Sequence, residues 1–163
     1  MTAGNTYTPI ATYTIPATVA STYTFSSISG SYTDLILVYE GIHTGNGDIR
    51  IQYNGDTGAN YSNNVVKGDG STVTVTRANA ATYIYLAYTD PSTRTMVIAH
   101  IQNYANTTTN KTLICKYGTA ATSTGLISGM WASTVAITSI TISSSVYNFS
   151  TGSTFSLYGI LAA

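Results

Sequence analysis

The stretch "TDLILVYEG", residues 33–41, is the strongest strand signal in the sequence. Its alternating residues are apolar on both faces, with Leu35, Leu37 and Tyr39 on one face and Ile36 and Val38 on the other. A strand of this kind lies in the middle of a sheet that is covered on both sides, or it offers its outer face to a partner. Both alternatives predict that this strand organises a sheet.

Further short segments rich in strand-forming residues occur along the chain, separated by Gly, Asn, Asp and Ser. They predict strands at residues 10–15, 21–28, 48–54, 71–76, 81–88, 94–103, 111–117, 134–142 and 153–161. The apolar phase changes between Ile137 and Ile140, which predicts a bulge near Ser139. "NGDTGANYSNN", residues 54–64, is predicted to be a loop because Asn and Gly supply positive φ at low cost. The spacing predicts about nine or ten strands in an all-β, single-domain antiparallel two-sheet sandwich, with a jelly roll favoured over a closed barrel. The domain covers residues 1–163, with residues 1–9 as a possible extended N-terminal arm.

The composition favours the same fold class. Hydrophobic residues make up 44% of the 163 residues, Thr and Ser supply about three residues in ten, and 14 Tyr accompany one Trp and 3 Phe. Thr and Tyr suit a pleated, half-buried surface. Tyr also suits contact surfaces and sugar stacking, although plain sheet packing accounts for most of such an enrichment.

Charge is scarce, at 7% of residues against about a quarter in an average domain. The first charged residue is Asp34 and the last is Lys116, so both ends of the chain are neutral. Six scattered basic residues and zero net charge argue against nucleic-acid binding. No apolar run reaches the length of a membrane span, and the N-terminus lacks the pattern of a signal peptide. The neutral ends are therefore predicted to be core or interface.

Groups with reaction chemistry are few. Cys115 is expected to be a small buried hydrophobe, and His100 a hydrogen-bonded structural histidine on the face of Met96 and Ile98. His43 lies near Glu40 and Asp48, where a weak metal or acid–base cluster competes with the favoured interpretation, a polar hairpin loop. "NGDTG", residues 54–58, is expected to be a turn and not a calcium loop. No catalytic residue, cofactor site or metal site is predicted. A polysaccharide hydrolase would need a carboxylate pair drawn from Asp34, Glu40, Asp48, Asp56, Asp69 and Asp90.

Five segments carry a resemblance to a known group: "SISGSYTDLILVYEG" (27–41), "IQYNGDTGANYSNN" (51–64), "IAHIQNYANTTTNKTLICKYG" (98–118), "MWASTVAITSITI" (130–142) and "FSTGSTFSLYGI" (149–160). In that order the chain resembles the small β-rich virion proteins of tailed bacteriophages, cyanophages among them, from about residue 11 to residue 160. The resemblance implies a structural component of a phage particle with no catalytic residues.

Two roles follow from this resemblance. The favoured one is a capsid decoration, or cement, protein that binds the major capsid protein and copies of itself, with a homotrimer expected from the resemblance, in the virion. The alternative is a tail-fibre or spike module that binds a host glycan. Obligate contacts are depleted of charge. The candidate interface is therefore the neutral C-terminal region, with Tyr147, Phe149, Phe155, Leu157, Tyr158 and Ile160.

Overall fold

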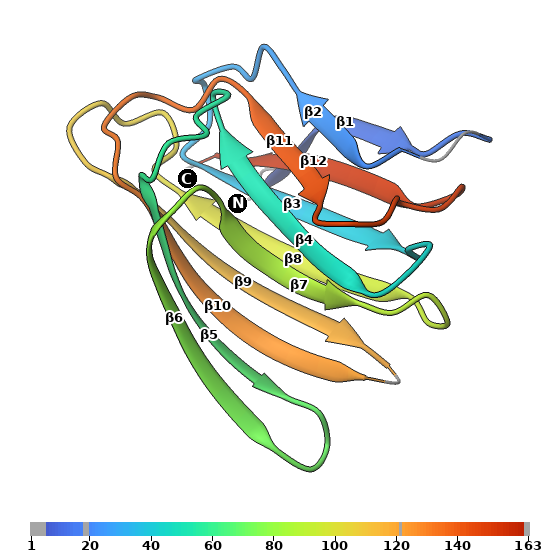
Figure 1. The fold of residues 1–163 in the computed structure, drawn as a ribbon. Coiled ribbons are helices and arrows are strands. Elements are labelled where there is room, and N and C mark those ends of the chain that lie inside the picture. The colour runs from blue at the N-terminus through green and yellow to red at the C-terminus, as the bar shows by residue number, and fades with distance from the viewer. Residues whose placement is uncertain (1–5, 18–19, 121, 162–163) are drawn as a thin grey trace, which may run out of the picture.

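The computed structural model describes residues 6–17, 20–120 and 122–161, and these form two antiparallel sheets (Figure 1). The larger sheet has the strand order β1 (Tyr7–Thr14), β12 (Thr154–Ile160), β3 (Asp34–Gly41), β8 (Thr95–Gln102), β9 (Lys111–Thr119), β10 (Ser123–Trp131), β5 (Tyr61–Gly68) and β6 (Val73–Ala81). The smaller sheet has the order β2 (Thr22–Phe25), β11 (Ile140–Ser144), β4 (Gly47–Tyr53) and β7 (Ile84–Thr89). The predicted all-β two-sheet sandwich is confirmed.

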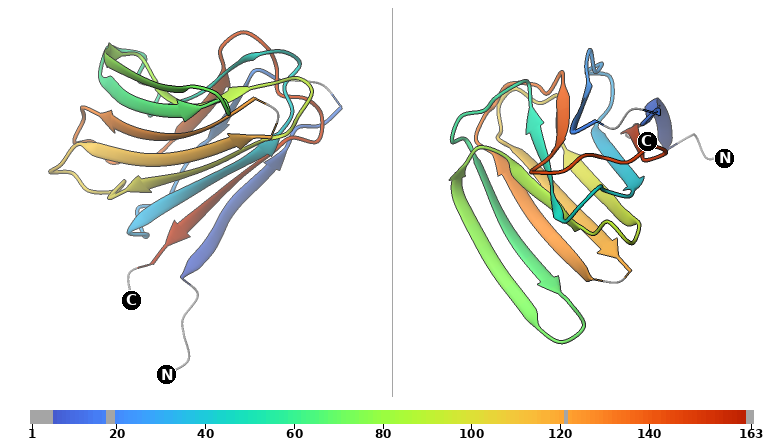
Figure 2. Two further views of the ribbon diagram at one scale, coloured as in Figure 1. Left: turned by 90° about the horizontal axis from the view of Figure 1, so that it is seen from below. Right: turned by 45° about the vertical axis from the view of Figure 1, so that its right-hand side comes forward.

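Eight strands alternate between the two sheets along the chain. β1, β3, β8 and β12 lie in the larger sheet, and β2, β4, β7 and β11 lie in the smaller one. The chain therefore crosses repeatedly between the two layers of the sandwich. The two hairpins β5–β6 and β9–β10 extend the larger sheet past β8, so that β5 and β6 lie beyond the small sheet (Figure 2).

The core lies between the sheets and is rich in aromatic rings. Phe155 from β12 contacts Tyr39, Phe149 and Tyr23, with ring centroids at 5.0, 4.9 and 5.8 Å. A second group at the other end of the sandwich places the Trp131 ring 5.6 Å from Tyr53 and 6.3 Å from Tyr61. These rings join the larger sheet to the smaller one.

β5 and β10 are strands that the sequence interpretation missed. Their glycines and asparagines indicate turns, yet packing places them in the sheet. Gly129 of β10 faces the small sheet, and a Cβ atom there would lie 2.5 Å from the Ile84 side chain. Asn63 of β5 is buried and donates a hydrogen bond from Nδ2 to the Tyr83 carbonyl at 3.5 Å. Tertiary contacts thus override local turn propensity.

Two boundaries also differ from the prediction. Residues 132–139 are a loop and not a strand, although residues 134–139 were predicted as part of one. The Ile137 backbone amide donates to the Tyr104 carbonyl, and the Ser139 carbonyl accepts from the Asn54 backbone amide. Neither hydrogen bond belongs to a strand ladder. The phase change at Ser139 is thus the start of β11 and not a bulge. The predicted arm is shorter than residues 1–9, since β1 begins at Tyr7; residues 1–5 lie outside the described residues. No helix occurs in the described part of the chain, so none there is long and apolar enough to cross a bilayer.

Candidate functional site

The outer face of the eight-stranded sheet carries a row of apolar side chains that a single lysine interrupts. Cross-strand register aligns Val75, Val66, Leu126, Lys116, Ile98 and Val38 from β6 to β3. Leu126 is 54% exposed and Val75 is 70% exposed, whereas the inward-facing Ile127 on the same strand as Leu126 is 0% exposed. Directly opposed side chains in a sheet are close neighbours, so the row is a single surface.

A neighbouring row widens this surface. Ile114, His100, Ile36 and Tyr158 follow one another from β9 to β12. Met96, two residues before Ile98, is 51% exposed on the same face. We call the set Val38, Val66, Val75, Met96, Ile98, Ile114 and Leu126 the apolar outer face. Contiguous apolar surface of this kind is typical of protein–protein contact sites.

A shallow hollow interrupts the apolar outer face at Gly118. It has a volume of about 230 Å³, and Met96, Ile98, Lys116 and Thr124 are among its lining residues. Nothing lies within 4 Å of the position that a Gly118 Cβ atom would occupy. The missing side chain therefore leaves room for a side chain from another molecule.

Charged groups on this face are mostly paired at the margins. Arg94 Nε donates to Glu40 at 2.9 Å, and the His100 Nε2 atom lies 2.8 Å from the Asp34 carboxylate, which also accepts the Asn103 amide. The predicted hydrogen-bonded structural role of His100 is confirmed. Lys116 is different, because no carboxylate among the described residues forms an ion pair with it.

The six predicted interface residues divide into two groups. Phe149, Phe155 and Leu157 are 0% exposed, so their prediction as surface contacts is wrong. Alternation along β12 turns Phe155 and Leu157 into the sandwich. Tyr158 and Ile160 point outward and are half-buried, and Tyr147 is exposed in the loop after β11. These three stay candidates, and Tyr158 borders the apolar outer face through its register with Ile36.

His43 is neither a loop residue in water nor part of a metal or acid–base cluster. It is 1% exposed, its Nδ1 atom lies 3.2 Å from the Tyr39 hydroxyl, and its ring packs 4.6 Å from Phe149. Burial lowers the pKa of His43 to about 4, so the ring is neutral at pH 7. Glu40 and Asp48, the expected partners, instead pair with Arg94 and Arg50. The polar-loop interpretation and the cluster are both corrected to a core histidine.

The other reactive groups are similarly enclosed. Cys115 is buried as predicted, and burial raises the pKa of its thiol to about 12. The predicted turn at residues 54–58 is confirmed by left-handed φ values of 52° at Asn54 and 69° at Gly55. Hydrogen bonds from Trp131, Asn60 and the Gly58 amide lower the pKa of Asp56. Within residues 6–17, 20–120 and 122–161, no three His, Cys, Asp or Glu residues are grouped to hold a metal ion.

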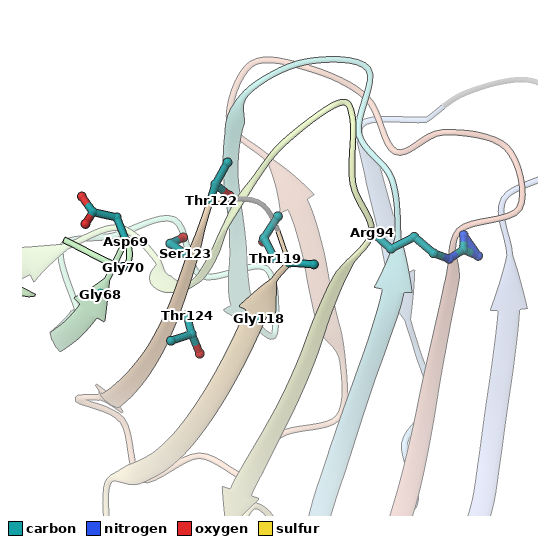
Figure 3. Close-up of a pocket in the computed structure, with 10 residues that line it drawn as sticks. Gly68, Asp69, Gly70, Arg94, Gly118, Thr119, Thr122, Ser123 and Thr124 are labelled. Atoms are coloured by element: carbon teal, nitrogen blue, oxygen red, sulfur yellow. The ribbon is translucent and has the colours of Figure 1, made fainter. Parts of the chain in front are cut away.

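Another hollow, of about 520 Å³, lies where loops meet at one end of the larger sheet (Figure 3). Asp69 and Arg94 stand on opposite sides of it, and Figure 3 shows their charged groups pointing away from each other. The Asp69 carboxylate accepts the amides of Ser71 and Thr72, and Arg94 binds Glu40. Its charged groups are therefore engaged in holding local structure.

Sequence reasoning missed much of the apolar outer face because it missed β5 and β10. The alternation that could have revealed it is Leu126, Ser128 and Met130 on one side of β10, against Ile127 and Trp131 on the other. Comparisons of the chain with protein-family models, curated proteins and solved structures gave no match.

Proposed function

We propose that this chain is a structural protein of a bacteriophage particle, a decoration protein that binds the major capsid protein on the outside of the shell. The observation that supports this role best is the apolar outer face, which spans β3, β8, β9, β10, β5 and β6 and has no further protein layer over it among the described residues. The protein acts by burying this surface, and it performs no reaction.

The occupant of the face follows from its chemistry. Apolar side chains of several strands need an apolar partner surface, because leaving Leu126 or Val75 in water forfeits the free energy of burial. Lys116 lies between Leu126 and Ile98 in the same row, without an ion pair. A buried cation requires a partner, so the matching surface on the capsid subunit carries a carboxylate within an apolar patch.

β3 gives independent support to an outward role. Its inner residues Leu35, Leu37 and Tyr39 are fully buried, whereas Ile36 and Val38 on the outer side are only half-buried. Of the two alternatives that the sequence left open for this strand, a strand that offers its outer face to a partner fits these burial values better.

Self-association is part of the proposal. Copies on a symmetry axis of the shell would contact each other as a homotrimer, and Tyr158 and Ile160 at the β12 margin of the face are available for this contact. Binding to the assembled shell then stabilises the particle by mass action.

The test is co-sedimentation of the purified chain with particles of the bacteriophage that encodes it, together with its copy number per particle by quantitative mass spectrometry. We expect saturable binding and hundreds of copies, with density on the outer shell by electron microscopy. Val66→Asp places a charge in the row and should weaken binding at least about a hundredfold. Val135→Asp is the matched control, since Val135 is 60% exposed but lies in the loop after β10. A handful of copies per particle, or equal binding by both variants, would refute the proposal.

A further inference from the structure

A groove opens on the other face of β5 and β6, where the hairpin extends beyond the small sheet (Figures 1 and 2). Its volume is about 280 Å³. One wall is the edge of the small sheet, with Tyr83, Tyr85 and Tyr88 from β7 and the residue before it. The opposite wall is the hairpin, with Lys67, Thr74 and Thr76 among its residues. The groove exists because β6, the outermost strand of the larger sheet, has no strand of the smaller sheet over it.

Two of these tyrosines, Tyr85 and Tyr83, are held in place by contacts with neighbouring side chains. The Tyr85 ring meets the buried Tyr117 ring edge-on, with centroids 6.3 Å apart, and burial raises the pKa of Tyr85 well above its usual value. The Arg50 guanidinium lies 4.1 Å from the centre of the Tyr83 ring and 3.7 Å from the Asp48 carboxylate. A fixed aromatic ring loses little conformational entropy when a ligand stacks on it.

One charged group in the groove, Lys67, has no ion-pair partner among the described residues. The Lys67 ammonium reaches across from β5 and lies 5.4 Å from the centre of the Tyr88 ring. No carboxylate within the described ranges forms an ion pair with Lys67, whereas the Asp48 carboxylate is engaged by Arg50. The groove therefore presents aromatic faces, hydroxyl and amide groups, and one available positive charge.

We propose that this groove binds a saccharide that carries a carboxylate. On binding, the Lys67 ammonium leaves the Tyr88 ring to pair with the sugar carboxylate, and the apolar C–H face of the sugar ring stacks on Tyr88 in its place. The sugar hydroxyls bond the Thr74 and Thr76 hydroxyls. Nucleic acid fits less well, because phosphate recognition depends on several clustered cations and only Lys67 is unpaired here.

This site is compatible with the proposed function and does not depend on it. Val66 and Val75 point out of the opposite side of the same hairpin, as their register and alternation with Val65 and Thr74 require. A copy that docks by the apolar outer face therefore leaves the groove open to the surroundings.

The experiment applies the labelled full chain to immobilised oligosaccharides ending in glucuronate, galacturonate or sialic acid, beside neutral oligosaccharides of equal length. We expect at least one carboxylated oligosaccharide to retain the chain. Its neutral counterpart should bind the chain at least about tenfold more weakly. Tyr88→Ala should weaken binding about tenfold by removing the stacking face, and Tyr88→Phe should keep it. Lys67→Gln, on the hairpin, should reduce the affinity for the carboxylated sugar to that of the neutral one.

Tyr7→Ala is the control and should bind as the unchanged chain does, because Tyr7 is 58% exposed on β1, at the edge of the larger sheet farthest from the groove. Retention of no saccharide would overturn the proposal, as would a Tyr88→Ala variant with unchanged affinity or an equal preference for neutral sugars. Val66→Asp separates the two proposals, because it should abolish particle binding and leave saccharide binding intact.

Discussion

Replacing Phe155 with Ala tests whether the neutral C-terminal strand belongs to the core, as the structure has it, or to a contact surface. The Phe155 side chain is fully buried and its ring meets those of Tyr39, Phe149 and Tyr23 within 5.8 Å. A Phe→Ala change in a core costs about 3–5 kcal/mol, a range that includes the lost contacts of the ring. We expect the free energy of unfolding to fall by about 4 kcal/mol, which corresponds to about 8–16 °C in Tm for a domain of this size.

The assay is equilibrium unfolding in urea, followed by circular dichroism and by the fluorescence of Trp131, the single tryptophan. Trp131 lies in the other aromatic group of the core, so coincident transitions indicate that the sandwich unfolds as one unit. Tyr158→Ala is the control, because Tyr158 is on the same strand and faces outward; it should cost about 1 kcal/mol or less. A loss below about 1 kcal/mol for Phe155→Ala, independent of protein concentration, would contradict the core assignment.

Three further predictions concern single positions. The pKa of His43 is about 4 in the folded chain and near 6.5 in the unfolded chain, so on acidification the unfolded state binds a proton before the folded state does. The contribution of His43 to stability is therefore complete above about pH 6.5, and the free energy of unfolding falls by about 3 kcal/mol as the pH drops to about 4. Urea unfolding at several pH values should show this loss, and His43→Phe should remove it; an identical pH dependence in both chains would disprove it. Asn54→Ala should cost about 2–4 kcal/mol in the same assay, because the Asn54 side chain accepts the amides of Thr138 and Ser139 and donates to the Ala136 carbonyl. Asn103→Ala, at a similar positive φ of 48° but with no side-chain hydrogen bond to the described residues, should cost clearly less, and equal losses would count against this account. Gly118→Leu should keep the free energy of unfolding within about 0.5 kcal/mol yet weaken particle binding by filling the hollow, whereas Gly125→Leu should unfold the chain because its side chain collides with the Tyr117 ring. Normal particle binding by Gly118→Leu would exclude the hollow from the contact.

The sequence predicts those strands well whose burial is recorded by alternating apolar residues. β3, β4 and β8 all have apolar residues at alternate positions, and the structure places these strands at or near the predicted residues. β10 was harder to predict, because Gly129, which is there to admit Ile84 from the opposite sheet, interrupts the apolar alternation of Ile127 and Trp131. That requirement belongs to the packing of two sheets, and it weakens the local strand signal.

The candidate surface was predictable only in part, for a related reason. A period of two tells which residues share a face, but not which face is covered. Phe155 and Leu157 therefore could not be distinguished from Tyr158 and Ile160 without knowing where the second sheet lies. The apolar outer face is also assembled from three separate parts of the chain (β3, β5–β6 and β8–β10), so its extent appears only when their register is known.

The edges of the two sheets explain why contacts between molecules are directed to a face. A long, regular edge strand invites pairing with another chain, and charged residues usually prevent this. This chain has few charges, and its edges are instead short or irregular. Pro9 lies at a register shift in β1, β2 has four residues, and the ladders that join β7 and β6 to their neighbours both contain shifts. Edge-to-edge pairing is disfavoured at each of these strands, which agrees with our proposal that the sandwich associates through the apolar outer face.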